Sequence, residues 1–272
     1  MLQGWPGGPG SGDLGGGPGE EGLVRDTSAG QHHVPDPLPF DEALRERIRT
    51  HLGGHRRRVV EIGERRHAAV ALVLVDSTGL PARVDPVHPA GAPVHDPGAL
   101  DDSGLESATG GAAFLLCRRP LNLRRHAGQY ALPGGRLDEG EGVVEAALRE
   151  THEEVGLELG EEPVLGLLDD YETRSGFVMT PVVVWAGSAP DLRPDPGEVH
   201  AVYRVGLHHL LREDSPRISR IPQSPRPVLA VPLGDSLIHA PTAAVLLQLG
   251  WLGLQGRPTP VHGFESPTFA WR

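Results

Sequence analysis

Residues 135–157 constrain the fold of this chain more than any other segment, and they read GRLDEGEGVVEAALRETHEEVGL. Pro133, Gly134 and Gly135 end an apolar run, and such residues predict a loop between a strand and a helix. The next residues carry largely apolar side chains at spacings of three and four, which is typical of a helix with one buried stripe. The stripe consists of Val144, Ala147, Leu148, Thr151 and Val155. We therefore expect a strand, a loop and a helix over residues 142–155 that packs on a core.

Three glutamates lie off this stripe. Glu150, Glu153 and Glu154 are three and four residues apart, so their Cβ atoms share one helix face at separations of about 5–6 Å. Two such charges repel by about 3 kcal/mol at an effective dielectric of about 20, and three in a cleft require a cation. A hard divalent ion with oxygen ligands, Mg²⁺ or Mn²⁺, suits them best.

The alternative for these glutamates is a solvated helix face, where a like-charge pair costs only about 0.2–0.5 kcal/mol. The neighbouring glycines favour the metal site, because they let backbone carbonyls approach a ligand closely. Arg149 lies one turn before Glu153 and can orient a carboxylate through a charge-assisted hydrogen bond. The sequence therefore predicts a metal site on this helix.

The same segment follows the pattern G-x5-E-x7-R-E-U-x-E-E-x-G-U, where U is typically an apolar residue. The marked positions are occupied by Gly135, Glu141, Arg149, Glu150, Thr151, Glu153, Glu154, Gly156 and Leu157. The segment resembles the Nudix box over its whole length. This resemblance implies an α/β fold, a mixed-sheet α/β/α sandwich, and an enzyme that uses divalent ions to hydrolyse a nucleoside diphosphate linked to another group.

The resemblance also implies roles for individual residues. Glu150 and Glu154 correspond to the principal metal ligands, and the carbonyl of Gly134 to a backbone ligand. Glu153 corresponds to a further ligand or to the residue that activates water. Arg149 corresponds to a supporting group, and with Glu150 and Glu153 it completes the expected catalytic set.

Two further carboxylates are candidates for the site. The resemblance implies Glu141 as a second supporting group, and Glu198 lies outside the box in the stretch PDPGEV of residues 194–199. Most glutamates in such a loop are only solvent-exposed. Which carboxylate acts as the base stays open, because it varies across the family.

A second motif precedes the box. Residues 115–135 read LLCRRPLNLRRHAGQYALPGG, similar to the L-L-T-x-R-S-x3-R-x3-G-x3-F-P-G-G signature of the Nudix subfamily that acts on coenzyme A. Arg119, Arg124 and Gly128 match in spacing, and we expect them to bind the substrate, because guanidinium groups fit phosphates. We expect Arg118 and Arg125 to face solvent. The chain departs from the signature at Cys117, Pro120 and Leu132, which stand for Thr, Ser and Phe.

The expected activity is the Mg²⁺- or Mn²⁺-dependent cleavage of coenzyme A or its thioesters into 3′,5′-ADP and 4′-phosphopantetheine or its acyl form. The main alternative substrate is ADP-ribose or another nucleoside diphosphate sugar. An alternative of another class is a non-catalytic Nudix module that senses a nucleotide. The three intact box glutamates argue against that module, because a binder would not need all of them.

One domain with two tails is the expected organisation. Residues 1–36 are dominated by Gly and Pro and are expected to be disordered, residues 37–256 to form the Nudix domain, and residues 257–272 to be a mobile C-terminal extension. Pro-, Gly-, Asp- or Ser-rich residues 77–111 and 212–227 are expected as loops. The apolar patterns predict helices over 41–52, 207–211 and 242–252, and strands over 68–75, 112–117, 164–168, 178–186 and 200–205.

Composition excludes several other classes of protein. The net charge is −11 and no aromatics interleave with the basic run 56–58, which argues against nucleic acid. No apolar run approaches the roughly 20 residues that span a membrane. The single Cys117 cannot form an intramolecular disulfide, which fits a reducing cytoplasm, and a buried structural thiol is expected there. The adjacent pairs 32–33 and 208–209 are read as surface or loop histidines, and family habit makes a homodimer plausible.

Overall fold

The computed structural model describes residues 33–86, 105, 109–123, 126–188, 190–234 and 236–268. From His33 on, these residues form one compact unit. Most of the segment expected to be disordered, residues 1–32, lies outside the described residues, as do Arg124 and Arg125. Within the described ranges, no helix is both long and apolar enough to cross a membrane.

A mixed sheet forms the centre of the unit, and its described strands run in the order β2-β9-β3-β1-β8-β6. β1 and β8 pair in parallel, whereas the other neighbours are antiparallel. β4 pairs with β3, β5 with β1, and β7 with β8, in each case antiparallel. The strands are β1 (Arg66–Asp76), β2 (Arg83–Val84), β3 (Ala112–Arg118), β4 (Tyr130–Ala131), β5 (Gly134–Arg136), β6 (Val164–Leu167), β7 (Tyr171–Glu172), β8 (Phe177–Ser188) and β9 (Ala201–Gly206).

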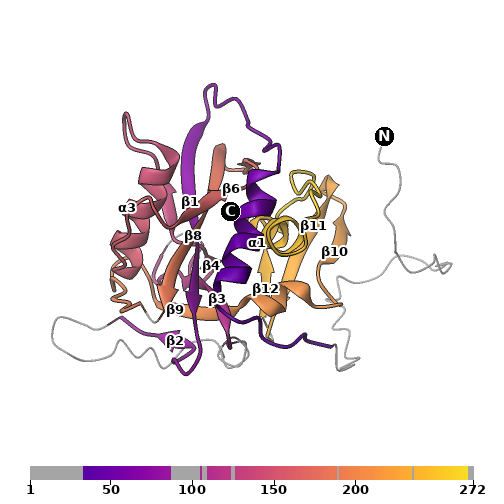
Figure 1. Cartoon of the computed structure of the whole chain (residues 1–272). Coiled ribbons are helices and arrows are strands. Elements are labelled where there is room, and N and C mark those ends of the chain that lie inside the picture. The colour runs from indigo at the N-terminus through magenta and orange to yellow at the C-terminus, as the bar shows by residue number, and fades with distance from the viewer. Residues whose placement is uncertain are drawn as a thin grey trace. The chain divides into compact units, whose positions relative to one another are not determined.

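The alternation of side chains along β1 builds a layer on each face of the sheet. Leu72 and Leu74 enter one hydrophobic cluster, while Ala71 and Val73 enter another on the opposite face. The first cluster contains helix α1 (Glu42–Gly53) and helix α4 (Thr242–Gln248), and the second contains helix α3 (Val143–Val155). Figure 1 shows α3 on the left of the sheet and α1 on the right. The prediction of an α/β/α sandwich with a mixed sheet is therefore confirmed.

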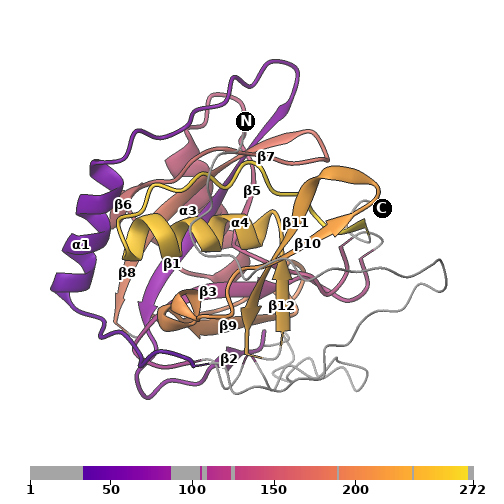
Figure 2. The same ribbon diagram turned by 90° about the vertical axis from the view of Figure 1, so that its right-hand side faces the viewer.

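The helices begin and end where the sequence provides caps. The side chain of Asp41 accepts the N–H of Leu44 at 2.8 Å and starts α1, whose buried face consists of Leu44, Ile48 and Leu52. α4 continues into a π-helical turn, η2 (Leu249–Leu254), and both elements are buried throughout. Figure 2 shows the yellow α4 lying across the strands.

The predicted loop over residues 212–227 is wrong in its second half. A separate sheet contains β10 (Arg217–Ile221), β11 (Ser224–Leu233) and β12 (Ser236–His239) in the order β10-β11-β12. Pro225 and Pro227 suggested a loop, but they lie between the paired positions 224 and 228, next to a register shift where no ladder N–H is needed.

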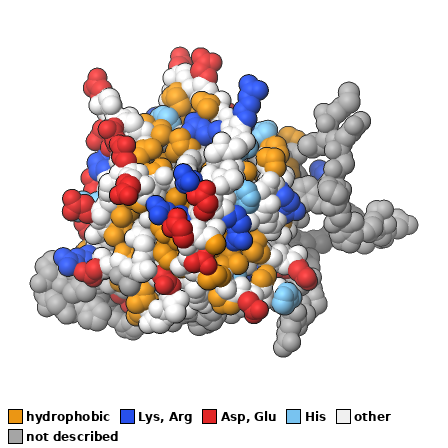
Figure 3. Space-filling view, in the orientation of Figure 1, with side chains coloured by type: hydrophobic (Ala, Val, Ile, Leu, Met, Phe, Trp, Pro, Cys, Tyr) orange, Lys and Arg blue, Asp and Glu red, His pale blue; other side chains and the backbone are white. Residues whose placement is uncertain are grey.

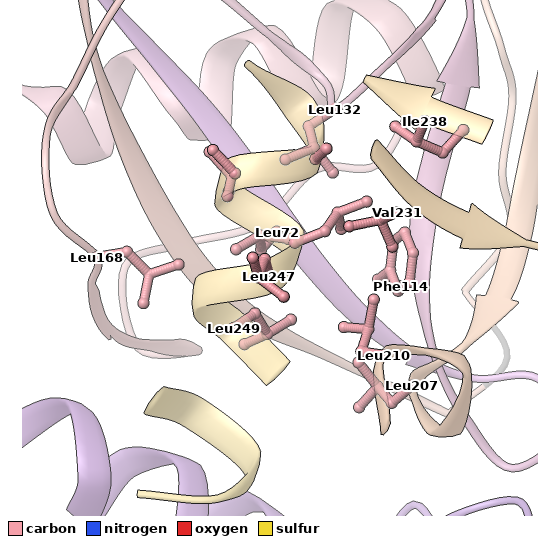
Figure 4. Packing of buried hydrophobic residues seen from close by; sticks show 14 of the residues in the cluster. Leu72, Phe114, Leu132, Leu168, Leu207, Leu210, Val231, Ile238, Leu247 and Leu249 are labelled. Carbon is pink, nitrogen blue, oxygen red and sulfur yellow. The ribbon is translucent and has the colours of Figure 1, made fainter. Parts of the chain in front are cut away.

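This second sheet closes the larger core. Val231 and Ile238 pack with Leu72 and Phe114 of the central sheet, and with Leu247 of α4 (Figure 4). The 3₁₀ turn η1 (Leu207–Leu211), which follows β9, adds two leucines to the same cluster. The larger core therefore lies on the α1 and α4 side of the central sheet.

Residues 257–268 pack on the domain, in contrast to the mobile extension expected from the sequence. Val261 and Phe264 are buried, and the hydroxyl of Tyr171 donates to the carbonyl of Phe264 at 3.0 Å. Glu265 forms a bridge with Val228 of β11. The composition of this Pro- and Gly-rich segment suggested mobility, but its few apolar residues pack on the domain.

Candidate active site

Helix α3 carries the box glutamates and is capped at both ends. The carboxylate of Glu145 accepts the N–H of Gly142 at 2.7 Å, and Gly156 ends the helix in a left-handed conformation with φ 71°. The buried face of α3 matches the predicted stripe at four of five positions, and its members are Ala146, Ala147, Leu148, Thr151 and Val155. The three box glutamates lie outside this buried stripe.

Two glycines of β5 provide the surface against which the carboxylates lie. A Cβ atom at Gly135 would lie 2.1 Å from Oε1 of Glu150, so any side chain at position 135 would displace that carboxylate. The N–H of Gly134 donates to Oε1 of Glu154 at 3.2 Å. The structure thus brings Glu150 and Glu154 to the predicted loop, with the amide of Gly134 as the recorded contact.

Arg149 holds this cluster together. Its Nε and Nη2 donate to both oxygens of Glu141 at 2.8 and 3.0 Å, and Nη1 donates to Glu150 and Glu153 at 2.9 Å each. Nη2 also donates to the carbonyl of Arg136 at 3.1 Å. A guanidinium has five N–H donors, and all five are used here. Arg149 is therefore a supporting group with no donor left for a substrate.

The electrostatic environment separates Glu154 from the other carboxylates. Burial, with smaller contributions from the charges of Glu150 and Glu198, raises the pKa of Glu154 to about 8, although the Gly134 hydrogen bond and Arg119 act in the opposite direction. Burial also raises the pKa of Glu150, and Arg149 partly offsets this effect. Negative charge at Glu154 is therefore under-compensated by the protein.

Glu141 and Arg149 stabilise each other's charged forms. The hydrogen bond from Arg149 lowers the pKa of Glu141, and the same contact raises the pKa of Arg149 above its ordinary value. Acidic side chains gather at the left edge of Figure 3, where Figure 1 places α3. An anionic substrate would have to overcome this charge or share it with a cation.

Cys117 lies beneath the metal-ligand candidate Glu154. Its side chain is fully buried, and its pKa is raised by burial first and by the charge and hydrogen bond of Glu154 second. Such a thiol stays protonated, in agreement with the expectation of a buried structural cysteine. The contact could have been foreseen from strand alternation, since residues 113, 115 and 117 face α3 together.

The loop before β9 brings Glu198 to the cluster. Its side chain is exposed, yet its charge contributes to the raised pKa of both Glu150 and Glu154. Glu153 is 52% exposed and bound to Arg149. The sequence singled out Glu198 but gave no indication of the residues that hold its loop, which are Arg193 and Asp195.

The basic residues before the box differ from expectation. Arg119 is exposed, and its charge acts on Glu154, which places it beside the site. Arg118, the last residue of β3, was predicted to face solvent, but it is only 1% exposed. Its guanidinium lies over the ring of Tyr130, and its Nε donates to the carbonyl of Gly128 at 3.4 Å, which explains the burial. Gly128 adopts φ 64° in the turn, with its N–H bound to the carbonyl of Pro120.

The histidine pair of η1 also differs from expectation. His208 and His209 were read as surface or loop residues, but both are more than nine-tenths buried, with ring centroids 4.3 Å apart. Burial lowers the pKa of His209 to about 4. The pair therefore belongs to the packed core beneath β11 and stays neutral at neutral pH.

A cavity of about 530 Å³ opens beside the box helix. It is lined by Arg136, Leu137, Asp138, Glu139, Arg149 and Glu150. Within the described ranges, no group of three or more His, Cys, Asp or Glu side chains converges closely enough to enclose a metal ion. Of the three box glutamates, Glu150 is the one that lines this cavity.

Comparisons with known proteins match the part of the chain that contains the box. The NUDIX domain family model matches residues 105–223. The uncharacterized Nudix hydrolase NudL of Pectobacterium atrosepticum is 40% identical over 95 residues, which cover 35% of this chain and 50% of that protein. NudL of Escherichia coli O1:K1 is 41% identical over 101 residues, which cover 36% and 52%. The chain therefore spans about half the length of the curated relatives it matches.

The similarity to solved structures is weaker than the similarity to these relatives. The MutT protein of Methanosarcina mazei Go1 is 22% identical with a TM-score of 0.34, covering 54% of this chain and 80% of that one. A MutT/nudix family protein of Enterococcus faecalis is 17% identical with a TM-score of 0.36, covering 68% and 54%. The family assignment rests on the sequence matches and on the intact box. Residues 105–223 of this chain therefore belong to the NUDIX domain family.

Proposed function

We propose that the chain is a divalent-metal-dependent hydrolase that cleaves the diphosphate linkage of a nucleoside diphosphate derivative. The observation that carries this proposal is the buried carboxylate of Glu154, whose pKa is raised to about 8 beside Glu150. Burying negative charge is costly unless a cation or hydrogen bonds compensate it. All donors of Arg149 are engaged in the cluster, so a bound cation would supply the missing charge.

The donor set fits Mg²⁺ or Mn²⁺. The oxygens of Glu150 and Glu154 are hard ligands, and Glu153 and the carbonyl of Gly134 stand beside them as further candidates. Mg²⁺ is usually held by one or two carboxylates together with water and substrate phosphate oxygens. Glu150 lines a cavity of about 530 Å³ and Glu154 lies one helical turn further along, which matches that habit.

The metal ion and the side chains around it have separate roles in the proposed reaction. The bound ion would neutralise diphosphate oxygens and lower the pKa of a bound water. Arg149 orients Glu150 and Glu153 through its shared Nη1. We assign the acceptance of the water proton to a carboxylate oxygen of Glu198, because Oε2 of Glu153 is engaged by Arg149.

Coenzyme A or an acyl derivative is the substrate that we propose. The support is the motif of residues 115–135, together with the exposed Arg119 beside Glu154, where a guanidinium can meet a phosphate. Arg124 and Gly128 complete the proposed contacts from the same motif, and Arg124 lies outside the described residues. A cytoplasmic location and a homodimer remain part of the proposal, and light scattering would test the latter.

A substrate panel tests the proposal. The full chain is incubated with Mg²⁺ and coenzyme A, acyl derivatives, ADP-ribose or NADH, and the products are separated by chromatography. Release of 3′,5′-ADP is the expected result. Release of AMP from ADP-ribose at higher kcat/KM would replace the substrate but keep the chemistry. No turnover with any of them would favour a nucleotide-sensing module and overturn the proposal.

A further inference from the structure

The loop of residues 193–198 is fastened to the C-terminal end of α3. The N–H of Arg193 donates to the carbonyl of Val155 at 2.9 Å, and the N–H of Asp195 donates to the carbonyl of Glu154 at 3.0 Å. The last carbonyls of a helix have no partner within the helix. The loop supplies two of these partners, so its position is fixed relative to the helix that carries Glu150 and Glu154.

Gly156 makes this docking possible. Its φ of 71° is a left-handed conformation that favours glycine, and a Cβ atom there would lie 2.6 Å from the carbonyl oxygen of Arg193. The final glycine of the box therefore serves two purposes. It ends the helix, and it leaves room for the loop to lie against it.

Asp195 organises the rest of the loop. Its Oδ1 accepts the N–H of Gly197 at 2.7 Å, and its carbonyl accepts the N–H groups of Glu198 and Val199 at 3.1 and 3.0 Å. Val199 is 2% exposed and anchors the end of the loop in the core beneath α3. The backbone of Glu198 is thus held between a capped turn and a buried side chain.

This turn restricts the positions from which the carboxylate of Glu198 can approach the site. Glu198 is exposed, and its charge is felt by both Glu150 and Glu154. An exposed glutamate on an unrestrained loop would sample many positions, at a cost in conformational entropy whenever it entered the site. The turn at Asp195 removes much of that cost.

We infer that Asp195 is a positioning residue of the reaction, whose carboxylate caps the turn that holds Glu198 beside Glu150 and Glu154. This inference rests on the proposed function and on the assignment of Glu198 to the site. Asp195 itself contacts no reacting atom. Its contribution passes through the backbone of residues 197–199.

The matched pair Asp195→Ala and Asp195→Asn isolates the cap. Asparagine keeps an oxygen that accepts the Gly197 N–H, whereas alanine does not. We expect Asp195→Ala to lower kcat by about 10- to 100-fold with KM within about twofold, since a displacement of about 1 Å can cost about 100-fold. Asp195→Asn should retain kcat within about threefold. Equal losses in the two variants would overturn the inference.

A double variant tests the route through Glu198. If Asp195 acts through Glu198, then Asp195→Ala adds less than about threefold to the loss caused by Glu198→Gln, because coupled residues are non-additive. Losses that multiply would show an independent structural role and overturn the inference. A Glu198→Gln variant with the kcat of the wild type would overturn it as well.

Mn²⁺ binding provides a readout that needs no turnover. Electron paramagnetic resonance of free Mn²⁺ gives the affinity of each full-length variant, and we expect Asp195→Ala and Glu198→Gln to weaken it by a similar factor, within about tenfold, while Asp195→Asn does not. Unchanged affinity in both of the first two variants would overturn the inference. If the wild type hydrolyses nothing in the panel, the proposed function fails while this series still decides the role of Asp195.

Folding is monitored by circular dichroism. If Asp195→Ala does not fold, Gly197→Pro removes the donor of the same hydrogen bond from the other side. The expected loss of kcat and of Mn²⁺ affinity is the same. A folded Gly197→Pro variant with the properties of the wild type would overturn the inference.

Discussion

The fold surrounds two acidic pairs in opposite ways. The first pair, Asp169 and Asp170, lies at the turn before β7 and is buried. Oδ2 of Asp170 accepts the N–H of Val60 at 2.9 Å, and its Oδ1 accepts the hydroxyl of Thr180 at 2.7 Å. The guanidinium of Arg57 lies 3.2 Å from the same carboxylate.

Asp169 is compensated as fully as its neighbour. Its Oδ1 accepts the N–H of Arg58 at 2.8 Å and lies 2.8 Å from Nε2 of His55. The basic run of residues 56–58, from which no nucleic-acid binding was expected, thus anchors a segment to this pair through Arg57 and Arg58. Arg58 also binds Glu172 of β7 at 2.6 Å.

The second pair, Glu150 and Glu154, has fewer partners. Glu154 receives the N–H of Gly134 at 3.2 Å and the thiol of Cys117, a weak donor, and burial raises its pKa to about 8. This difference in the number of hydrogen-bond and charge partners indicates that Asp169 and Asp170 stabilise the fold, whereas Glu150 and Glu154 serve function. A compensated carboxylate fixes a segment, whereas an under-compensated one retains capacity for a cation.

Removing the charge of Glu154 should have the largest effect. We expect Glu154→Gln to lower kcat about 1000-fold, several kcal/mol of transition-state stabilisation, because the amide cannot hold a divalent ion as a carboxylate does. Steady-state kinetics with the best substrate of the panel measures it. Glu158→Gln, at an exposed position after the helix, is the control and should match the wild type. More than a tenth of the wild-type kcat in Glu154→Gln would contradict its assignment as a ligand.

The compensated pair should respond in stability instead. Asp170→Asn is expected to lower the free energy of unfolding by about 3 kcal/mol, since it breaks a buried pair with Arg57 and turns a donor toward the N–H of Val60 or the Thr180 hydroxyl. Urea denaturation measures this change. Asp191→Asn breaks an exposed pair with Arg193 and should cost less than about 1 kcal/mol. Similar losses of unfolding free energy in both variants would contradict the stabilising role of the buried pair.

Displacing Glu150 without changing its charge sharpens the comparison. Gly135→Ala places a methyl group where Oε1 of Glu150 lies, and we expect a loss of kcat of about 100-fold from the displaced carboxylate. Gly160→Ala has open space and serves as the control. Wild-type kinetics in Gly135→Ala would show that the position of Glu150 does not matter.

The smallest of the four expected effects is the change in stability with pH that the raised pKa of Glu154 causes. The folded-state pKa of Glu154 lies above its ordinary value of 4.5, so its contribution to stability is present below that value and is lost as the pH rises toward about 8. With a chelator, we expect the melting temperature to fall by a few degrees between pH 6.5 and 8.5, and by less in Glu154→Gln. His209 does not titrate in this window, because burial lowers its pKa to about 4. Parallel curves for the two proteins would contradict the raised pKa.

Local patterns in the sequence were sufficient for the parts of the site that lie within one helix. The spacing of residues 150, 153 and 154 requires a shared face, and the stripe from Ala147 to Val155 fixes which face is buried. The predicted strands and the helix that begins after Asp41 were correct for the same reason. The strands β10 and β11, which lie in a Pro- and Ser-rich segment, were missed because tertiary contacts override local preference.

The sequence by itself determined the box helix and its glycines, because periodicity and breaker residues mark them locally, whereas the sandwich was implied by the resemblance to the Nudix box. The tertiary structure alone decided that Arg118 is buried, that all five donors of Arg149 are engaged, and that Asp195 fastens the loop of Glu198 to the helix end. These features join residues far apart in the chain. Their geometry is set by the packing of whole elements, which no local pattern encodes.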